Sequence, residues 1–186
     1  GRSRGVVVDA QGELRRSHTC GEVLPSDIGE EVVLAGWVHR RRDHGGVIFV
    51  DLRDRTGIVQ VVFKPEVAAE THTRAGALRS EFVILVRGLV ERRSEDTVNP
   101  EMPTGEIEVS ATELRLLNTA TAPPFPLEED PGVDESVRLR HRLHDLRRAP
   151  LQRALEIRHR FFQETRAALC ELGFLEIETP MLARST

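Results

Sequence analysis

The sequence contains few cysteines and few aromatic residues. Among 186 residues there are two cysteines, one tryptophan, seven phenylalanines and no tyrosine. Cys20 and Cys170 lie far apart, without metal-type spacing or disulfide density, which fits a reducing compartment. No segment approaches the roughly 20 apolar residues of a membrane helix, and no signal-peptide pattern is found. We therefore expect a cytoplasmic protein without membrane association.

Lysine is also nearly absent. Lys64 is the single lysine among 26 basic residues, so arginine carries the positive charge. A compositional bias of the source genome or a preference for forked phosphate-binding donors would each account for this. The formal net charge of -4 excludes a uniformly basic nucleic-acid binder, so any attraction to nucleic acid must be local. Arginines are concentrated in residues 36–64 and 138–166, whereas residues 119–137 are acidic.

Short segments with turn signals between them predict five β-strands. They cover residues 32–41, 47–53, 58–63, 82–93 and 106–116. Gly45-Gly46 and residues 54–57 supply the first two turns. Residues 65–78 have Ala and Leu at helical spacing, with Pro65 suited to the first helical position. Five strands with one helix between the third and fourth predict an all-β OB-fold barrel.

One face of this predicted barrel suits nucleic-acid binding. Alternation along the second strand places Phe49 on the face opposite the core, among polar neighbours. Gln60 in the third strand and Glu108 in the fifth are expected on the same outer surface. OB-folds bind oligonucleotides across strands two and three. Taken singly, all three residues could instead be ordinary solvated strand residues. His39 and His44 lack a third ligand at useful spacing, so we expect no metal site.

The character of the sequence changes after the fifth strand. A Pro-rich acidic stretch predicts a linker, and Leu151 to Leu172 has helical spacing with Gly173 as a C-cap. Residues 174–182 then alternate like a strand. We therefore predict four regions, the last being an incomplete α+β domain. They are a loose tail at 1–18, the barrel at 19–118, a linker at 119–150 and the truncated domain at 151–186.

The ordered motifs resemble the bacterial aspartyl-tRNA synthetase family of class II ligases, in which an N-terminal OB-fold binds the anticodon. The resemblance runs from about Ser17 to Thr186. Its densest parts are residues 36–63, 105–109, 121–126, 145–148 and 173–182. The last of these is similar to class II motif 1, which forms the dimer interface of that family. The resemblance therefore implies a homodimer with Pro180 at its interface.

The resemblance also implies roles for individual residues. Phe49 would stack on the central anticodon uridine, Gln60 would hydrogen-bond that base, and Glu108 would read the first base, a guanine or its modified form. Further tRNA-binding residues would be Arg40, Arg41 and Arg42, which contact phosphates, and Asn99. His44 and Asp96 bear on discrimination between tRNA(Asp) and tRNA(Asn). His44 matches family members that charge both tRNAs, whereas Asp96 does not match them. Whether tRNA(Asn) is a second partner therefore stays open.

The whole protein would use ATP and Mg2+ to form aspartyl-tRNA, and DNA is not an expected partner. The ATP-holding motifs of the family would lie beyond Thr186, so we expect this segment to be inactive alone, with no catalytic residue and no bound cofactor. One alternative is a free-standing OB-fold that binds single-stranded nucleic acid without base choice. Another is an asparagine or lysine synthetase of the same subclass. The segment similar to motif 1 disfavours a free-standing OB-fold. The spacing within residues 40–60 favours an aspartate synthetase over an asparagine or lysine synthetase.

Overall fold

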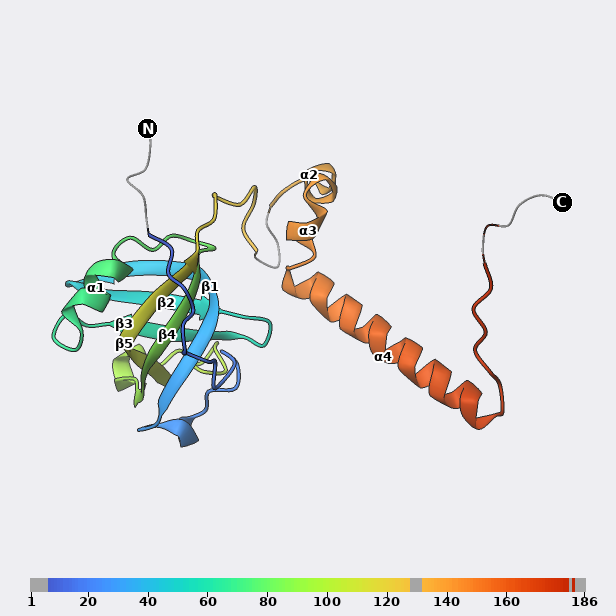
Figure 1. Ribbon diagram of the computed structural model, residues 1–186, viewed down its shortest axis with the longest axis horizontal. Helices are drawn as coiled ribbons and strands as arrows, with labels where there is room; N and C mark the ends of the chain where they lie inside the picture. Colours follow the sequence, from blue (N-terminus) through green and yellow to red (C-terminus); the bar gives the residue numbers. More distant parts are fainter. Residues whose placement is uncertain (1–6, 128–131, 181, 183–186) are drawn as a thin grey trace. The chain divides into compact units, whose positions relative to one another are not determined.

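A computed structural model describes residues 7–127, 132–180 and 182 of the chain (Figure 1). The chain divides into two compact units, Gly1–Ala122 and Pro123–Thr186. The division falls inside the predicted linker. Every helix in the described part is too short or too polar to cross a membrane.

The first unit is a closed five-stranded barrel (Figure 1). Its strands are β1 (Glu31–His44), β2 (Val47–Arg53), β3 (Ile58–Phe63), β4 (Val83–Arg92) and β5 (Ile107–Asn118). The pairs β1–β2, β2–β3, β1–β4 and β4–β5 are antiparallel, and a parallel β3–β5 contact closes the ring. This topology confirms the predicted OB-fold. The bounds of β2 and β3 are those predicted from the sequence.

Alternate side chains of each strand form the barrel core. In β2 and β3 the members of the core cluster are Ile48, Val50, Leu52, Val59, Val61 and Phe63, and the intervening Gln60 and Val62 are also buried. Because successive side chains point to opposite faces of a sheet, the residues between them lie on the outer side. Phe49 and Gln60 are therefore held on the outer side of the sheet, where Phe49 is half-buried and Gln60 is 6% exposed.

Glycine and aspartate form the two predicted turns. Gly45 and Gly46 have φ of 61° and 82°, which a two-residue hairpin with positive φ at both positions requires. In the second turn the Asp54 backbone N–H donates to the Gly57 carbonyl at 3.0 Å. The Asp54 carboxylate also accepts from the Thr56 N–H at 2.8 Å. Both turns join strands at the predicted positions.

The helix between β3 and β4 is shorter than predicted. It is α1 (Ala69–Ala75), and the prediction that Pro65 occupies its first position is wrong. The N–H groups of Val67 and Ala68 donate to the Lys64 carbonyl, so Pro65 lies in a turn that precedes the helix. Composition indicated a helix here, but the local turn determines where it begins.

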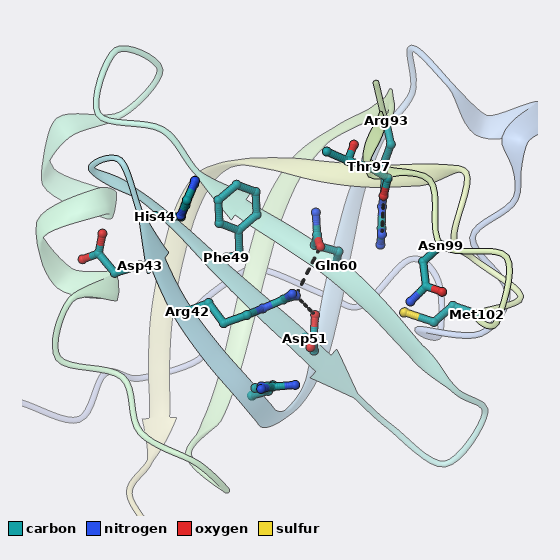
Figure 2. Close-up of a pocket in the computed structure, with 11 residues that line it drawn as sticks. Arg42, Asp43, His44, Phe49, Asp51, Gln60, Arg93, Thr97, Asn99 and Met102 are labelled. Atoms are coloured by element: carbon teal, nitrogen blue, oxygen red, sulfur yellow. Dashed lines mark hydrogen bonds and ion pairs between the residues drawn. The ribbon is translucent and has the colours of Figure 1, made fainter. Parts of the chain in front are cut away.

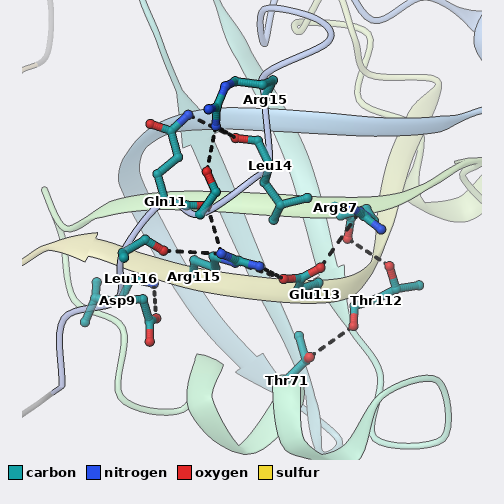
Figure 3. A network of polar contacts seen from close by, with 12 residues as sticks. Asp9, Gln11, Leu14, Arg15, Thr71, Arg87, Thr112, Glu113, Arg115 and Leu116 are labelled. Atoms are coloured by element: carbon teal, nitrogen blue, oxygen red, sulfur yellow. Dashed lines mark hydrogen bonds and ion pairs between the residues drawn. The ribbon is translucent and has the colours of Figure 1, made fainter.

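The N-terminal segment, expected to be a loose tail, is bound to the barrel from Asp9 onward. The Asp9 N–H donates to the Leu116 carbonyl at 2.7 Å, and its carboxylate accepts from the Leu116 N–H at 2.8 Å (Figure 3). Leu14 is buried, and the Ser17 N–H donates to the Val33 carbonyl at 2.9 Å. Backbone hydrogen bonds, the Asp9 carboxylate and one apolar side chain leave no periodic pattern in the sequence. Gly1 to Val6 lie outside the described residues.

The second unit is helical. Its helices are α2 (Glu135–Arg140), α3 (Arg142–Asp145) and α4 (Ala149–Glu171). The predicted helix at 151–172 corresponds to α4. Gly173, with φ of 83°, donates its N–H to the Cys170 carbonyl, and Phe174 donates to the Leu169 carbonyl. These two bonds are the Schellman arrangement that ends a helix at glycine.

The strand predicted after α4 is not formed in the described residues. Residues 174–180 and 182 follow the helix without pairing to another strand, and Met181 lies outside the described residues. A β-strand needs a neighbour for its backbone N–H and C=O groups. Among the described residues, the second unit contains no strand that could pair with it. The alternating pattern of this segment therefore has no ladder to join.

Candidate nucleic-acid interface

A pocket of about 670 Å³ lies on the outer side of β1, β2 and β3. The segment between β4 and β5 completes its wall (Figure 2). Its lining residues are Arg40, Arg42, Asp43, His44, Phe49, Asp51, Gln60, Arg93, Thr97, Asn99 and Met102. Three of them are arginines and two are aspartates, so the pocket is locally positive on a chain whose net charge is -4. One aromatic ring among such polar groups suits an unstacked base beside a phosphate.

Phe49 contributes that aromatic ring. On β2 it lies opposite Arg42 of β1 and Val62 of β3, on the outer side of the sheet. Its side chain is half-buried, and Figure 2 shows it among the polar groups of the pocket. A ring held by its strand and accessible from one side is a platform on which a flat base can stack.

Gln60 lies in the floor of the pocket with both ends of its amide engaged. Arg42 Nη2 donates to Asp51 Oδ1 at 2.8 Å and to Gln60 Oε1 at 3.4 Å (Figure 2). On the other side, Gln60 Nε2 donates to Glu108 Oε2 at 3.1 Å. A donor at one end and an acceptor at the other set the orientation of the amide. Glu108 does not line the pocket, but it is hydrogen-bonded to a residue that does.

The three consecutive arginines of β1 separate onto two faces. Arg40 and Arg42 pair with outward-facing residues of β2, whereas Arg41 pairs with the buried Val50. Arg41 Nε donates to the Ala75 carbonyl of α1 at 3.2 Å. The structure thus brings Arg40 and Arg42 into the pocket and places Arg41 against α1. A phosphate contact by Arg41 stays a prediction.

Asn99 enters the pocket from the loop between β4 and β5. The Asn99 N–H donates to the Gly105 carbonyl at 3.1 Å, and the Met102 N–H donates to the Asn99 carbonyl at 3.2 Å. A Cβ atom on Gly105 would lie 1.8 Å from the Asn99 carbonyl oxygen, so only glycine permits this loop shape. His44 also lines the pocket, whereas Asp96, in the short 3₁₀ helix η2 (Glu95–Thr97), does not.

Arg93 is a pocket residue that the sequence did not indicate. It is 5% exposed, and its Nε donates to the Ile107 carbonyl at 2.9 Å. Its Nη2 is buried and has no hydrogen-bond partner among the described residues. Burial lowers the pKa of Arg93, but guanidinium is so basic that the group stays charged. An unsatisfied charged donor in the wall of a pocket is suited to an acceptor on a bound ligand. The predicted strand at 82–93 included Arg93, but β4 ends at Arg92, and nothing in the sequence pattern indicated that Arg93 enters the pocket.

Pro180 lies in the second unit, in the non-helical segment after α4. The apolar side chains of α4 are exposed, among them Phe161, Phe162 and Leu169. The predicted place of Pro180 at a dimer interface stays a prediction.

Two family models match separate parts of the chain, one in the barrel unit and one in the helical unit. Residues 32–117 match the OB-fold nucleic acid binding domain, the tRNA anticodon family. Residues 134–186 match the class II tRNA synthetases of the D, K and N group. The first match covers the barrel strands, and the second begins just before α2.

Individual relatives match over nearly the whole chain. The aspartate–tRNA(Asp/Asn) ligase of Desulfosudis oleivorans is 56% identical over 180 residues, which is 97% of this chain and 30% of that protein. The ligase of the same name from Moorella thermoacetica is 56% identical over 181 residues, again 97% of this chain and 30% of that protein. The chain thus spans about 30% of the length of the curated relatives it matches.

A solved structure is also similar to most of the chain. The crystal structure of asparaginyl-tRNA synthetase from Pyrococcus horikoshii, complexed with asparaginyl-adenylate, has a TM-score of 0.76 and 28% sequence identity to this chain. The match covers 90% of this chain and 37% of that one. The family matches and this likeness together assign residues 32–117 to the OB-fold nucleic acid binding domains of the tRNA anticodon family and residues 134–186 to the class II tRNA synthetases of the D, K and N group.

Proposed function

We propose that this chain is the anticodon-binding region of an aspartate–tRNA ligase. The observation that carries the proposal is the hydrogen-bonded row from Arg42 through Gln60 to Glu108 beside the ring of Phe49. The names of relatives 56% identical to the chain support the same function. The partner would be tRNA(Asp), read through its anticodon loop.

The side chains of the row suit the first two anticodon bases. Phe49 would stack on the central uridine, because aromatic stacking is how single-stranded bases are commonly held. After its two observed bonds, the Gln60 amide keeps one free N–H and one free lone pair on its oxygen. These two groups complement the pairing edge of a base that both accepts and donates hydrogen bonds. Glu108 would accept the two adjacent N–H groups of guanine at the first position.

We also propose tRNA(Asn) as a partner. The aspartate and asparagine anticodons share their first two bases, so Phe49, Gln60 and Glu108 would not distinguish them. The relatives named above carry both tRNAs in their names. Discrimination would depend on the third base, which the loop containing Asn99 and the buried Arg93 could reach. His44 and Asp96 are proposed to influence that choice.

For the whole protein we propose a cytoplasmic homodimer that forms aspartyl-tRNA from aspartate, ATP and tRNA, with Mg2+. The described residues contain no cluster of three or more His, Cys, Asp or Glu side chains that could hold a metal. We propose that ATP and Mg2+ act in the part of the ligase that corresponds to the remaining length of the relatives. This segment would contribute tRNA recognition.

The arginines of β1 allow a direct test of phosphate contact. Arg42→Ala is expected to weaken binding of every RNA sequence and to lower the slope of log affinity against log salt by roughly one. Arg41→Ala is a matched control, since its guanidinium is bonded to α1 rather than directed into the pocket. The slope should fall less in Arg41→Ala. Equal slopes for both variants and the parent would remove Arg42 from the phosphate contacts.

The proposal itself is tested by titrating the chain with an aspartate anticodon stem-loop and with an unstructured RNA of the same length and composition. Anticodon recognition predicts clear preference for the stem-loop at physiological salt. Equal affinity for both RNAs would support instead an OB-fold that holds single strands without choosing bases.

A further inference from the structure

We propose that Lys64 is a positioning residue for the first anticodon base, holding the Glu108 carboxylate in the orientation that accepts guanine. This inference rests on the proposed function and deepens it. Lys64 follows β3 directly and does not line the pocket. It would therefore act through Glu108 rather than touch the RNA.

Two carboxylates lie opposite each other beside Lys64. Glu91 of β4 and Glu108 of β5 are directly paired in the sheet register. Like charges in directly opposite positions destabilise a sheet and push the side chains apart. Lys64 Nζ lies 2.8 Å from Glu91 Oε2 and 3.6 Å from Glu108 Oε1, so one ammonium bridges both. Without it, the hydrogen bond from Gln60 Nε2 alone would hold Glu108 against the repulsion of Glu91.

The two oxygens of Glu108 have different partners. Lys64 faces Oε1, and Gln60 Nε2 donates to Oε2 at 3.1 Å. Contacts at both oxygens define the plane of the carboxylate. An ionised carboxylate has about four lone-pair sites, so one acceptor site remains on each oxygen. Guanine presents two adjacent N–H groups, which need one acceptor on each oxygen.

Because the Glu108 side chain is largely buried, its negative charge needs a nearby cation, which Lys64 supplies. The Glu108 side chain is 14% exposed and that of Lys64 26%. Burial of the ammonium alone would favour the neutral amine, but the hydrogen bond and charge of Glu91, with the charge of Glu108, raise the pKa of Lys64. Lys64 is therefore protonated at neutral pH. In a chain that otherwise uses arginine, a compact ammonium with three donors fits between two carboxylates.

Lys64→Met tests the inference through base choice. Stem-loops with guanine, inosine or adenine at the first position are titrated with the parent chain and the variant. We expect affinity for the guanine loop to fall about tenfold, with less than about threefold change for the adenine loop. Inosine, which lacks the exocyclic amino group, should fall between them. Lys64→Arg should recover most of the guanine affinity.

Two further variants separate positioning from general charge or stability. Arg92→Met removes one cation at the end of β4, where Arg92 is 3.8 Å from Glu106, and should leave guanine preference unchanged. In a Glu108→Gln background, Lys64→Met should cause no further loss, because the two residues act through one carboxylate. Thermal unfolding of each variant checks that the barrel is intact.

The outcomes are distinguishable. Equal weakening of all three loops by Lys64→Met, or full additivity with Glu108→Gln, would overturn the positioning role. Unchanged guanine affinity in a folded Lys64→Met variant would overturn it as well. If the parent chain itself shows no preference for guanine, the proposed reading of the first base fails, whatever Lys64 does.

Discussion

Replacing Phe49 with alanine is expected to weaken binding of the aspartate anticodon stem-loop by about 1–3 kcal/mol, the usual contribution of one base stacked on an aromatic ring. The ring lies on the outer side of β2 and is not part of the barrel core. Its removal should therefore reduce binding without unfolding the barrel. Fluorescence anisotropy with a labelled stem-loop gives the affinity, and thermal unfolding gives the stability.

Two controls make this prediction specific. Phe161→Ala, on the exposed surface of α4, removes the same ring from a residue outside the pocket and should not change affinity. A stem-loop with an abasic central position should bind the parent chain and Phe49→Ala almost equally, since there is no base to stack. Equal sensitivity of the intact and abasic loops to Phe49→Ala would contradict stacking on the central base.

Glu108→Gln is expected to have the second large effect, confined to RNA with guanine at the first anticodon position. Glutamine conserves the shape of the side chain, but replaces one acceptor oxygen by an NH2 group that faces the N–H donors of guanine. Hydrogen bonds to charged groups contribute about 1.5–3 kcal/mol, so affinity should fall by roughly tenfold to a hundredfold. Binding measured with guanine-first and adenine-first loops checks the prediction.

The matched control is Glu106→Gln, which makes the same chemical change in an exposed residue two positions earlier. It should leave the preference for guanine intact. If Glu108→Gln weakened guanine-first and adenine-first loops alike, the carboxylate would be acting on the fold or on the general field of the pocket. Base reading by Glu108 would then be wrong.

The barrel could be predicted closely from the sequence where alternation and turn residues agree. The β2 and β3 bounds were predicted correctly because β-branched and aromatic residues fill both segments and turn residues flank them, with Gly45-Gly46 before β2, residues 54–57 between the strands and Pro65 after β3. The start of α1 was not predicted, because a turn hydrogen-bonded to the Lys64 carbonyl delays it. The N-terminal segment was missed since its attachment to β5 uses backbone groups and the single side chains of Asp9 and Arg115, which form no periodic pattern.

The pocket was partly predictable for the same reason. Strand alternation alone places Phe49, Gln60 and Glu108 outside the core, so their shared face followed from the sequence. Arg41 and Arg42 differ only in strand register, which a bulge in β1 near His39 alters. Arg93 enters the pocket from an irregular segment after β4. Irregular segments take their shape from specific contacts, which no periodic pattern encodes.

The alternating segment after α4 shows another limit of sequence patterns. Its apolar and polar residues alternate as in a strand, but the described residues of the second unit provide no neighbouring strand. The pattern therefore indicates how the segment could pair, and pairing requires a partner strand. The chain spans about 30% of the length of its curated relatives.

The central claim is that this barrel reads an anticodon, and one titration tests it most directly. The chain is titrated with stem-loops of tRNA(Asp) and tRNA(Asn) and with the tRNA(Asp) loop in which another base replaces the central uridine. We predict tight binding of the first two and an affinity lower by about 1–3 kcal/mol for the third. Equal affinity for all three stem-loops would contradict anticodon reading by this pocket.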